Sequence, residues 1–109
     1  MADNLKKNTV KDIVDSLVEE FSPQKVILFG SRVADSGDAQ SDIDLLIIKE
    51  TDESFFNRLA DARRAVAGTH NGIPLDLLVL TPQELKERLD RGDQFIKDIT
   101  ENGRLLYAA

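Results

Sequence analysis

The strongest constraint on the fold is a pair of matching apolar runs, each interrupted by one aspartate near its start. The runs are Ile43-Asp-Leu-Leu-Ile-Ile48 and Leu75-Asp-Leu-Leu-Val-Leu80, and they agree residue by residue in type. Short runs of branched apolar residues are typical of strands that are buried on both faces of a sheet. The chain is therefore predicted to contain at least two covered strands, each carrying a carboxylate close to its beginning.

The rest of the chain alternates between strand and helix patterns. The run from Lys25 to Gly30 predicts another buried strand, and the apolar spacing from Val10 to Phe21 predicts an amphipathic helix capped by Asn8 or Thr9. Strands are further expected at 42–48, 73–80 and 104–107, helices at 51–67, 82–90 and 93–101, and a helix or loop at 31–41. This order predicts an α/β or α+β fold in which helices cover both faces of a small sheet.

Composition narrows the class of protein. A chain of 109 residues suits one domain, expected at 9–109, with residues 1–8 as a polar N-terminal tail. The net charge of −6 disfavours a nucleic-acid partner, and the absence of cysteine excludes disulfides and thiolate metal sites. No apolar run approaches the ~20 residues of a membrane span and no secretory signal is visible, so no membrane partner and a cytoplasmic location are expected.

Three aspartates form the first candidate site. Asp42 and Asp44 are two positions apart, so they point to the same face of their strand. Asp76 occupies the equivalent place in the second run and faces Asp44 if the two strands are neighbours. One such aspartate is often only an exposed turn residue. Three in this arrangement, with no basic residue beside them, favour a site for Mg²⁺ or Mn²⁺, which prefer oxygen ligands.

The turn after the first strand is the second candidate site. Gly30-Ser31-Arg32 follows the strand directly. A glycine followed by a hydroxyl residue can present backbone N–H groups and an Oγ to a phosphate, and Arg32 can add charge. Gly-Ser is also a common turn dipeptide, so by itself this segment indicates only a turn.

Taken together, these residues resemble the nucleotidyltransferase superfamily of the DNA polymerase β type. The shared pattern is Gly30-Ser31, ten residues, Asp42-Ile43-Asp44, and then Asp76 within an apolar strand. The segments 28–32 and 41–46 closely resemble the minimal nucleotidyltransferases, small prokaryotic proteins that are often antitoxins encoded beside a HEPN-domain toxin. In one departure from the pattern, Asp35 stands where the family commonly has a glycine.

The resemblance implies a polymerase β-like fold, a small mixed sheet with flanking helices, and a two-metal reaction on ATP. Asp42, Asp44 and Asp76 would be the catalytic residues and would hold two Mg²⁺ ions, with Mn²⁺ as an alternative. Gly30, Ser31 and Arg32 would bind the nucleotide triphosphate.

The resemblance also implies an acceptor and leaves alternatives open. The expected activity transfers AMP from ATP to a protein hydroxyl, a tyrosine of a HEPN toxin, so that the chain acts as an antitoxin. The alternatives are an antitoxin that neutralises its partner by binding alone, and a nucleotidyltransferase with a small-molecule acceptor. A homodimer or a hetero-oligomer remains open.

Residues outside these two sites have structural interpretations. His70 and the pair Arg63–Arg64 are expected at the solvent-exposed surface. Phe55 and Phe56 are adjacent in an expected helix and cannot both face one core, so they are expected in the core or at an interface with a partner.

Overall fold

The computed structural model describes residues 2–30 and 42–109, and side chains from residue 9 onward. Its elements are α1 (Ala2–Phe21), β1 (Lys25–Phe29), β2 (Ile43–Ile48), α3 (Phe55–Val66), β3 (Leu75–Leu80), α4 (Pro82–Asp90), α5 (Gln94–Asn102) and β4 (Arg104–Ala108). The expected helix or loop at 31–41 lies outside the described residues. None of the described helices is both long and apolar enough to cross a bilayer.

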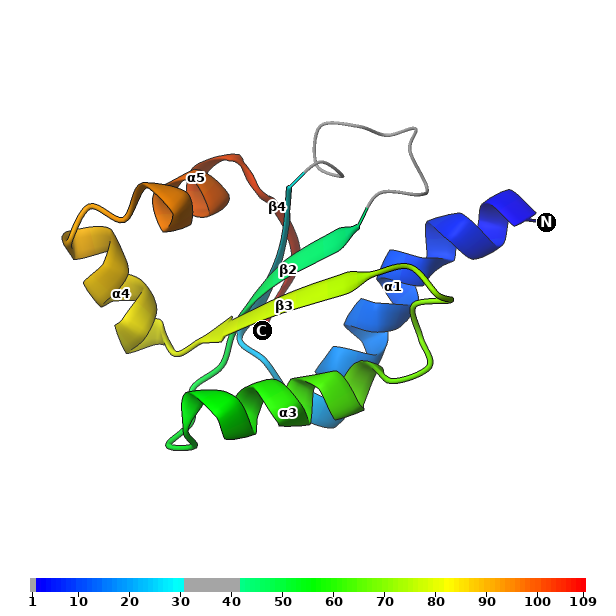
Figure 1. Cartoon of the computed structure of the whole chain (residues 1–109), viewed down its shortest axis with the longest axis horizontal. Helices are drawn as coiled ribbons and strands as arrows, with labels where there is room; N and C mark the ends of the chain where they lie inside the picture. Colours follow the sequence, from blue (N-terminus) through cyan, green and yellow to red (C-terminus); the bar gives the residue numbers. More distant parts are fainter. Residues whose placement is uncertain (1, 31–41) are drawn as a thin grey trace.

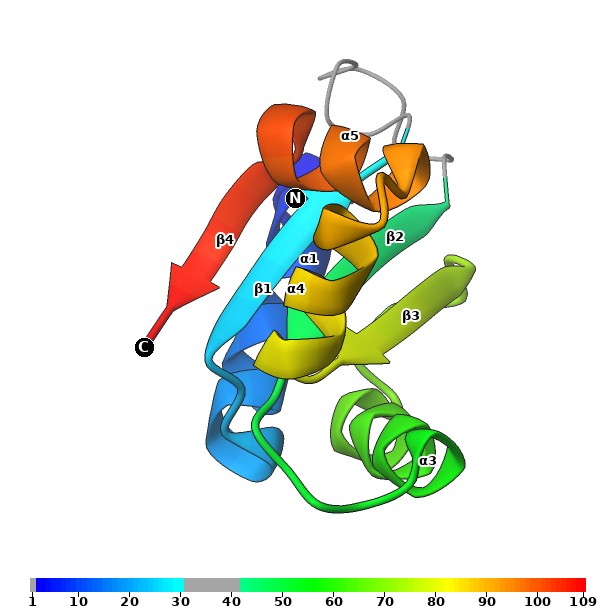
Figure 2. The same ribbon diagram turned by 90° about the vertical axis from the view of Figure 1, so that its left-hand side faces the viewer.

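The strands form one mixed sheet in the order β3-β2-β1-β4. β1 pairs antiparallel with both β2 and β4, and β2 pairs parallel with β3. Figure 1 shows α1 and α3 below the sheet, and Figure 2 shows α4 and α5 lying over its other face. This confirms the predicted α/β fold with both faces of the sheet covered.

Each face of the sheet has its own apolar core, because side chains alternate along every strand. The cluster under α1 and α3 contains Ile13, Leu17, Val26, Leu28, Ile43, Leu45, Ile47, Ala62, Val66 and Val79. The cluster under α4 and α5 contains Ile27, Leu46, Ile48, Leu80, Ile96 and Ile99. Even-numbered residues of β2 and β3 therefore face α4 and α5, and odd-numbered residues face α1 and α3.

Several helix and strand ends agree with their sequence signals. Thr81 and Glu84 form the predicted capping box of α4, and Gly68 follows α3 with a positive φ of +82°. The edge strand predicted at 104–107 is present as β4. The strand predicted from residue 73 begins at Leu75, because Pro74 has no N–H to donate, although its carbonyl accepts a bond from Ile43 N–H at 2.9 Å.

The predicted start of the first helix was wrong. The helix begins at Ala2, well before the expected caps Asn8 and Thr9. Residues 2–8 contain neither glycine nor proline, so nothing in their backbone stops the helix from extending. The division into a tail at 1–8 and a domain at 9–109 stays a prediction.

Candidate active site

Asp44 and Asp76 lie side by side at the edge of the sheet where β2 and β3 begin. The two strands are parallel and in register, with Asp44 opposite Asp76. Both are even-numbered, so they lie on the face covered by α4 and α5, where Leu46 and Leu78 join the core. The structure thus confirms that the matching runs are neighbours and that their aspartates meet.

The contact between the two carboxyl groups is electrostatically strained. Burial raises the pKa of Asp44, and a hydrogen bond with the Asp76 carboxyl and the charges of Asp76 and Asp42 raise it further. Two carboxylates on neighbouring register positions repel one another, so a bare anionic pair is disfavoured. The site therefore favours either a proton or a cation between these side chains.

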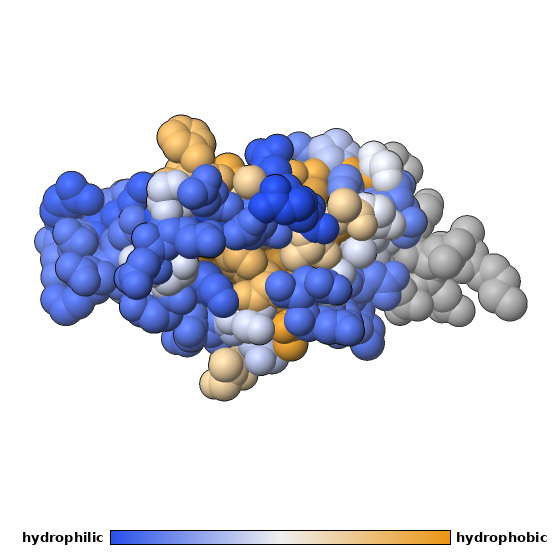
Figure 3. All heavy atoms as spheres, turned by 90° about the horizontal axis from the view of Figure 1, so that it is seen from below, coloured by the Kyte–Doolittle hydropathy of each residue, from blue (hydrophilic) through white to orange (hydrophobic). Residues whose placement is uncertain are grey.

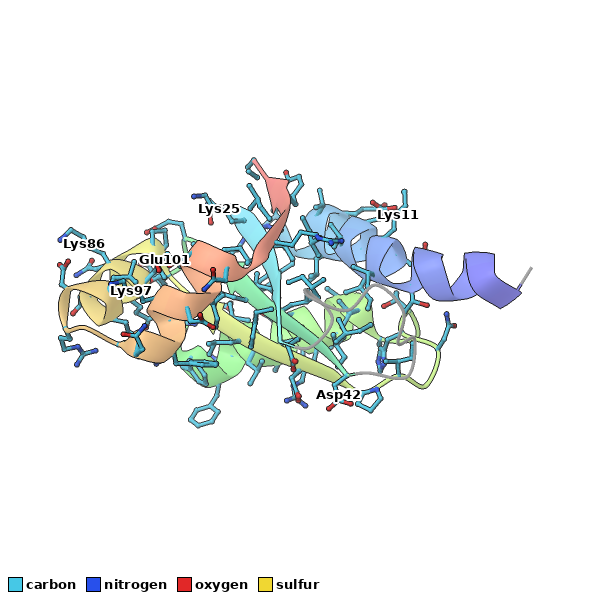
Figure 4. The ribbon with its side chains drawn as sticks, turned by 90° about the horizontal axis from the view of Figure 1, so that it is seen from above. Lys11, Lys25, Asp42, Lys86, Lys97 and Glu101 are labelled. Atoms are coloured by element: carbon cyan, nitrogen blue, oxygen red, sulfur yellow. The ribbon has the colours of Figure 1, made fainter. Side chains whose placement is uncertain are left out.

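Asp42 stands just outside this pair. It precedes β2, is exposed, and influences Asp44 through its charge. Figure 4 shows Asp42 at the start of β2 and well apart from the labelled lysines, which are Lys11, Lys25, Lys86 and Lys97. In the part of the chain that the structure describes, no ion pair involves Asp42, Asp44 or Asp76.

Gly30 brings the end of β1 against the carboxyl pair. Phe29 is the antiparallel partner of Asp44, and Gly30 follows it with a φ of +83°. A Cβ at Gly30 would overlap Oδ2 of Asp44 and lie 3.2 Å from its Cγ. Only glycine combines this backbone conformation with such a close approach. The predicted phosphate-binding residues Ser31 and Arg32, and the divergent Asp35, lie outside the described residues.

The donors are suited to a hard divalent cation, although they are not assembled into a complete metal site. Among residues 9–30 and 42–109, no group of three or more carboxylate or imidazole side chains is close enough to hold a metal ion. Two carboxylates in contact, with the Asp42 charge nearby, nevertheless match the oxygen ligands that Mg²⁺ prefers. Burial and the neighbouring carboxyl groups raise the pKa of Asp44, and a cation between Asp44 and Asp76 would offset the contribution of the like charges.

A separate hollow of about 560 Å³ lies at the other end of the sheet, where Lys49 follows β2. Its cations already have partners. Lys49 Nζ donates to the carbonyl oxygens of Phe21 at 2.6 Å and Ser22 at 3.2 Å, and Arg64 pairs with Asp61. The hollow therefore offers little unpaired charge to a phosphate, and it is remote from the candidate site.

Sequence reasoning missed a buried ion pair that connects α3 to α4. Arg58 is only 4% exposed, and its Nη2 donates to Oε1 and Oε2 of Glu84 at 2.6 and 2.7 Å. Burial alone would raise the pKa of Glu84, but hydrogen bonds from Arg58 and the Thr81 N–H, with the charges of Arg58 and Arg88, outweigh it and lower the pKa. The only sequence signal was an arginine one turn inside an amphipathic helix, which usually indicates a solvated position.

The remaining sequence interpretations have mixed outcomes. Arg63 and Arg64 are exposed, as predicted, whereas His70 is half-buried and its Nδ1 lies 2.8 Å from the Ile73 carbonyl. Phe55 and Phe56 do not enter the core, being 37% and 78% exposed. Figure 3 views the molecule from below, and on this side apolar side chains form a band across a mostly hydrophilic surface.

The fold and the acidic edge of the sheet define a class of protein: the small α/β domains of the polymerase β-like nucleotidyltransferases. The sequence profile of one family, described as "Nucleotidyltransferase domain", matches residues 9–107. The chain belongs to this nucleotidyltransferase family, whose general activity is the transfer of a nucleotidyl group.

Comparison with solved structures supports the same fold. The chain is similar to a Sulfolobus solfataricus protein, known from a 1.40 Å crystal structure, whose name gives it an inferred nucleotidyltransferase activity. The TM-score is 0.62 at 23% sequence identity, and the alignment covers 96% of this chain and 81% of the other. At this identity the likeness concerns the fold alone. No curated protein matches the sequence.

Proposed function

We propose that the protein transfers AMP from ATP to a protein hydroxyl, with a tyrosine of a HEPN-domain toxin as the acceptor, and thereby acts as an antitoxin. The observation that carries the proposal is the in-register contact of Asp44 and Asp76 beside Gly30. It gathers, on one edge of the sheet, the acidic and glycine parts of the pattern that the minimal nucleotidyltransferases share.

The acidic residues would hold the metal ions. Asp42 and Asp44 would bind both Mg²⁺ ions, and Asp76 would complete the ion beside the acceptor. When bound, these ions lower the pKa of the attacking hydroxyl and stabilise the charge that develops on the phosphates. The neighbouring positions of the two carboxyl groups support this assignment, because a cation between them would offset their like charges.

The chain's own residues would position the reactants and move one proton. Gly30 and Ser31 would hold the β- and γ-phosphates, because a residue without a side chain lets phosphate oxygens approach backbone N–H groups. The acceptor oxygen would form a bond to the α-phosphorus as the bond to the β-phosphate oxygen breaks, and pyrophosphate would leave. Asp76 would accept the acceptor's proton, since its carboxyl is exposed and therefore open to an incoming hydroxyl group.

A protein acceptor suits the charge of the molecule. The net charge of −6 opposes the approach of a polyanionic nucleic acid. Exposed aromatic residues on α3, above all Phe56, offer apolar contact to a protein partner.

The test is a transfer assay with α-labelled ATP, Mg²⁺ and a HEPN-domain protein encoded beside this chain. Label and a mass gain of AMP on that partner are the expected results. With γ-labelled ATP the mass gain should remain but the partner should carry no label, because the β- and γ-phosphates leave as pyrophosphate. Asp44→Asn should abolish transfer. Asp90→Asn is the matched control, because Asp90 lies in an exposed pair with Lys86 on α4 and its loss should leave transfer intact.

The other outcomes separate the alternatives. A stable complex without label on the partner would contradict the transfer reaction and support neutralisation by binding alone. Label on a small molecule but not on the partner would overturn the protein acceptor. Equal transfer by Asp44→Asn and the wild type would refute the assignment of the carboxyl pair.

A further inference from the structure

An exposed aromatic side chain stands beside the candidate active site without a role in the proposed reaction. Phe95 lies in the first turn of α5, and 56% of its surface is exposed. Its ring meets the Phe29 ring edge to face, with centroids 5.7 Å apart. Single exposed apolar residues are common on protein surfaces. What distinguishes Phe95 is that its exposed ring is held by Phe29, the strand partner of Asp44.

The sheet register places this aromatic pair next to the acids. Phe29 is the antiparallel partner of Asp44, and paired residues point to the same face of a sheet. Phe29 packs against the cluster under α4 and α5, on the same face as Asp44 and Asp76. A cross-strand spacing of ~5 Å and the 5.7 Å between the two rings link Asp44 to Phe95, so the Phe95 ring lies within roughly 11 Å of Asp44. This is comparable to the span of one nucleotide from phosphate to base.

The position of Phe95 is well defined by its surroundings. Asp93 caps α5 by accepting the Ile96 N–H at 3.2 Å, and Ile96 and Ile99 are buried in the core. Gly103 then ends the helix in close contact with Ile27 of β1. The helix is thus fixed at both ends, and a ring on its first turn presents a preorganised surface, which reduces the entropy lost on binding.

From these observations we infer that Phe95, supported by Phe29, is the stacking surface for the nucleobase of the nucleotide substrate. The inference rests on the proposed function, in that the triphosphate must lie at Gly30 and the carboxyl pair. A π-face accepts any base, so this contact would add affinity for nucleotides without selecting adenine over other bases. Phe95 is then a positioning residue that sets the direction in which the nucleoside leaves the phosphate site.

The test compares two probes that share a triphosphate but differ in the base. Binding of ATP and of inorganic tripolyphosphate, each with Mg²⁺, is measured by calorimetry on the wild type and on Phe95→Ala. Loss of a stacked ring should weaken the binding of ATP about 5- to 100-fold and leave the affinity for tripolyphosphate unchanged. Phe56→Ala is the matched control, because Phe56 is also an exposed helical phenylalanine but lies on α3, at the other face of the sheet.

A spectroscopic readout reports the contact directly. The chain has no tryptophan, so Phe95→Trp introduces a single tryptophan at the proposed surface, which can be excited apart from Tyr107. ATP should quench it while tripolyphosphate does not, and Phe56→Trp should respond to neither. Phe95→Trp should also keep ATP affinity, because an indole ring offers a stacking surface too, and the unchanged tripolyphosphate affinity of Phe95→Ala shows that this variant keeps its fold.

The outcomes separate this inference from the proposed function. Unchanged ATP affinity in Phe95→Ala overturns the stacking surface, and an effect confined to KM for the acceptor would assign the ring to the acceptor instead. If Phe95→Ala weakens the binding of ATP and of tripolyphosphate equally, Phe95 has a structural role, and the inference is also overturned. A wild type that binds neither probe overturns both the proposed function and the stacking surface.

Discussion

Replacing Gly30 by alanine should lower activity strongly while costing no more stability than alanine at a glycine with the same φ and open space around it. The substitution has two effects: it places a side chain at a φ of +83°, and it puts a Cβ into the Asp44 carboxylate. The first effect costs about 1–2 kcal/mol for an L-residue. The second is relieved when the Asp44 side chain rotates away, because a carboxylate at the end of a side chain moves more easily than backbone.

Two other glycines separate these effects. Gly68 has nearly the same φ, +82°, and nothing lies within 4 Å of an added Cβ, so Gly68→Ala measures conformational strain alone. Gly103 has an ordinary φ of −70°. A Cβ there would overlap the Ile99 carbonyl oxygen and lie 2.7 Å from Cγ2 of Ile27, so Gly103→Ala measures overpacking alone.

The expected order follows from these contacts. Gly30→Ala and Gly68→Ala should each lower the free energy of unfolding by about 1–2 kcal/mol. Gly103→Ala should lower it by about 2–3 kcal/mol, because the neighbours of Gly103 include backbone atoms that cannot move aside. In a domain of this size each 1 kcal/mol lowers Tm by about 4–8 °C. Only Gly30→Ala should lose transfer activity, by on the order of 100-fold, because it displaces Asp44.

Urea unfolding of the three variants, with the transfer assay on each, checks this reasoning. If Gly30→Ala costs as much stability as Gly103→Ala, Asp44 is held rigidly and the expected rotation is wrong. If Gly30→Ala keeps the activity of Gly68→Ala, the approach of β1 to Asp44 has no role in the reaction.

Three further substitutions test the electrostatics and the capping of the fold. Asp44→Asn should raise the free energy of unfolding at pH 7 by on the order of 0.5 kcal/mol, because it removes a partly buried charge beside Asp76. At a pH below the ordinary aspartate pKa of 3.8 the Asp44 carboxyl is protonated and the gain should disappear. Urea titrations that give the same gain at pH 7 and below pH 3.8 would contradict this. Thr81→Ala should cost about 1 kcal/mol by removing the cap of α4, and an unchanged Tm would show that the cap adds nothing. Glu84→Gln should cost up to about 3 kcal/mol because it leaves the Arg58 cation buried, and more than Arg58→Met, which leaves a partly exposed carboxylate; the reverse order would refute this. Because the pKa of Glu84 is lowered, its contribution is present above pH 4.5 and is lost as pH falls through the lowered value, so acid unfolding curves of the wild type and Glu84→Gln should converge there.

The acidic edge of the sheet could be predicted, because each of the two runs indicates by its own residues that it is a strand and where its aspartate lies. The matching positions of Asp44 and Asp76 require only that two similar strands be neighbours, and the alternation of side chains then puts both on one face. The capping box at Thr81 and Glu84 is likewise local, since both residues act within one helical turn. Features indicated by a local signal, or by two matching runs, were therefore predictable.

Features that depend on how dissimilar elements pack together were not predictable. Nothing in the run Lys25–Phe29 says that β1 pairs antiparallel with β2, so the contact between Gly30 and Asp44 could not be foreseen. Burial of Arg58 depends on Glu84, which lies in another helix. In both cases the deciding interaction joins elements that share no matching pattern, unlike the two runs around Asp44 and Asp76, so a single sequence gives no sign of it.

The paired aspartates also bear on how the sheet finds its correct alignment during folding. A slip of β3 by one residue would turn Asp76 toward the core under α1 and α3, where Leu45 and Val79 are fully buried. Burying a lone carboxylate there costs several kcal/mol, so the misaligned sheet is disfavoured from the outset. Asp44 and Asp76 thus fix the register between two runs that are otherwise nearly interchangeable. Substituting both by apolar residues should yield a sheet in which β2 and β3 pair in more than one alignment.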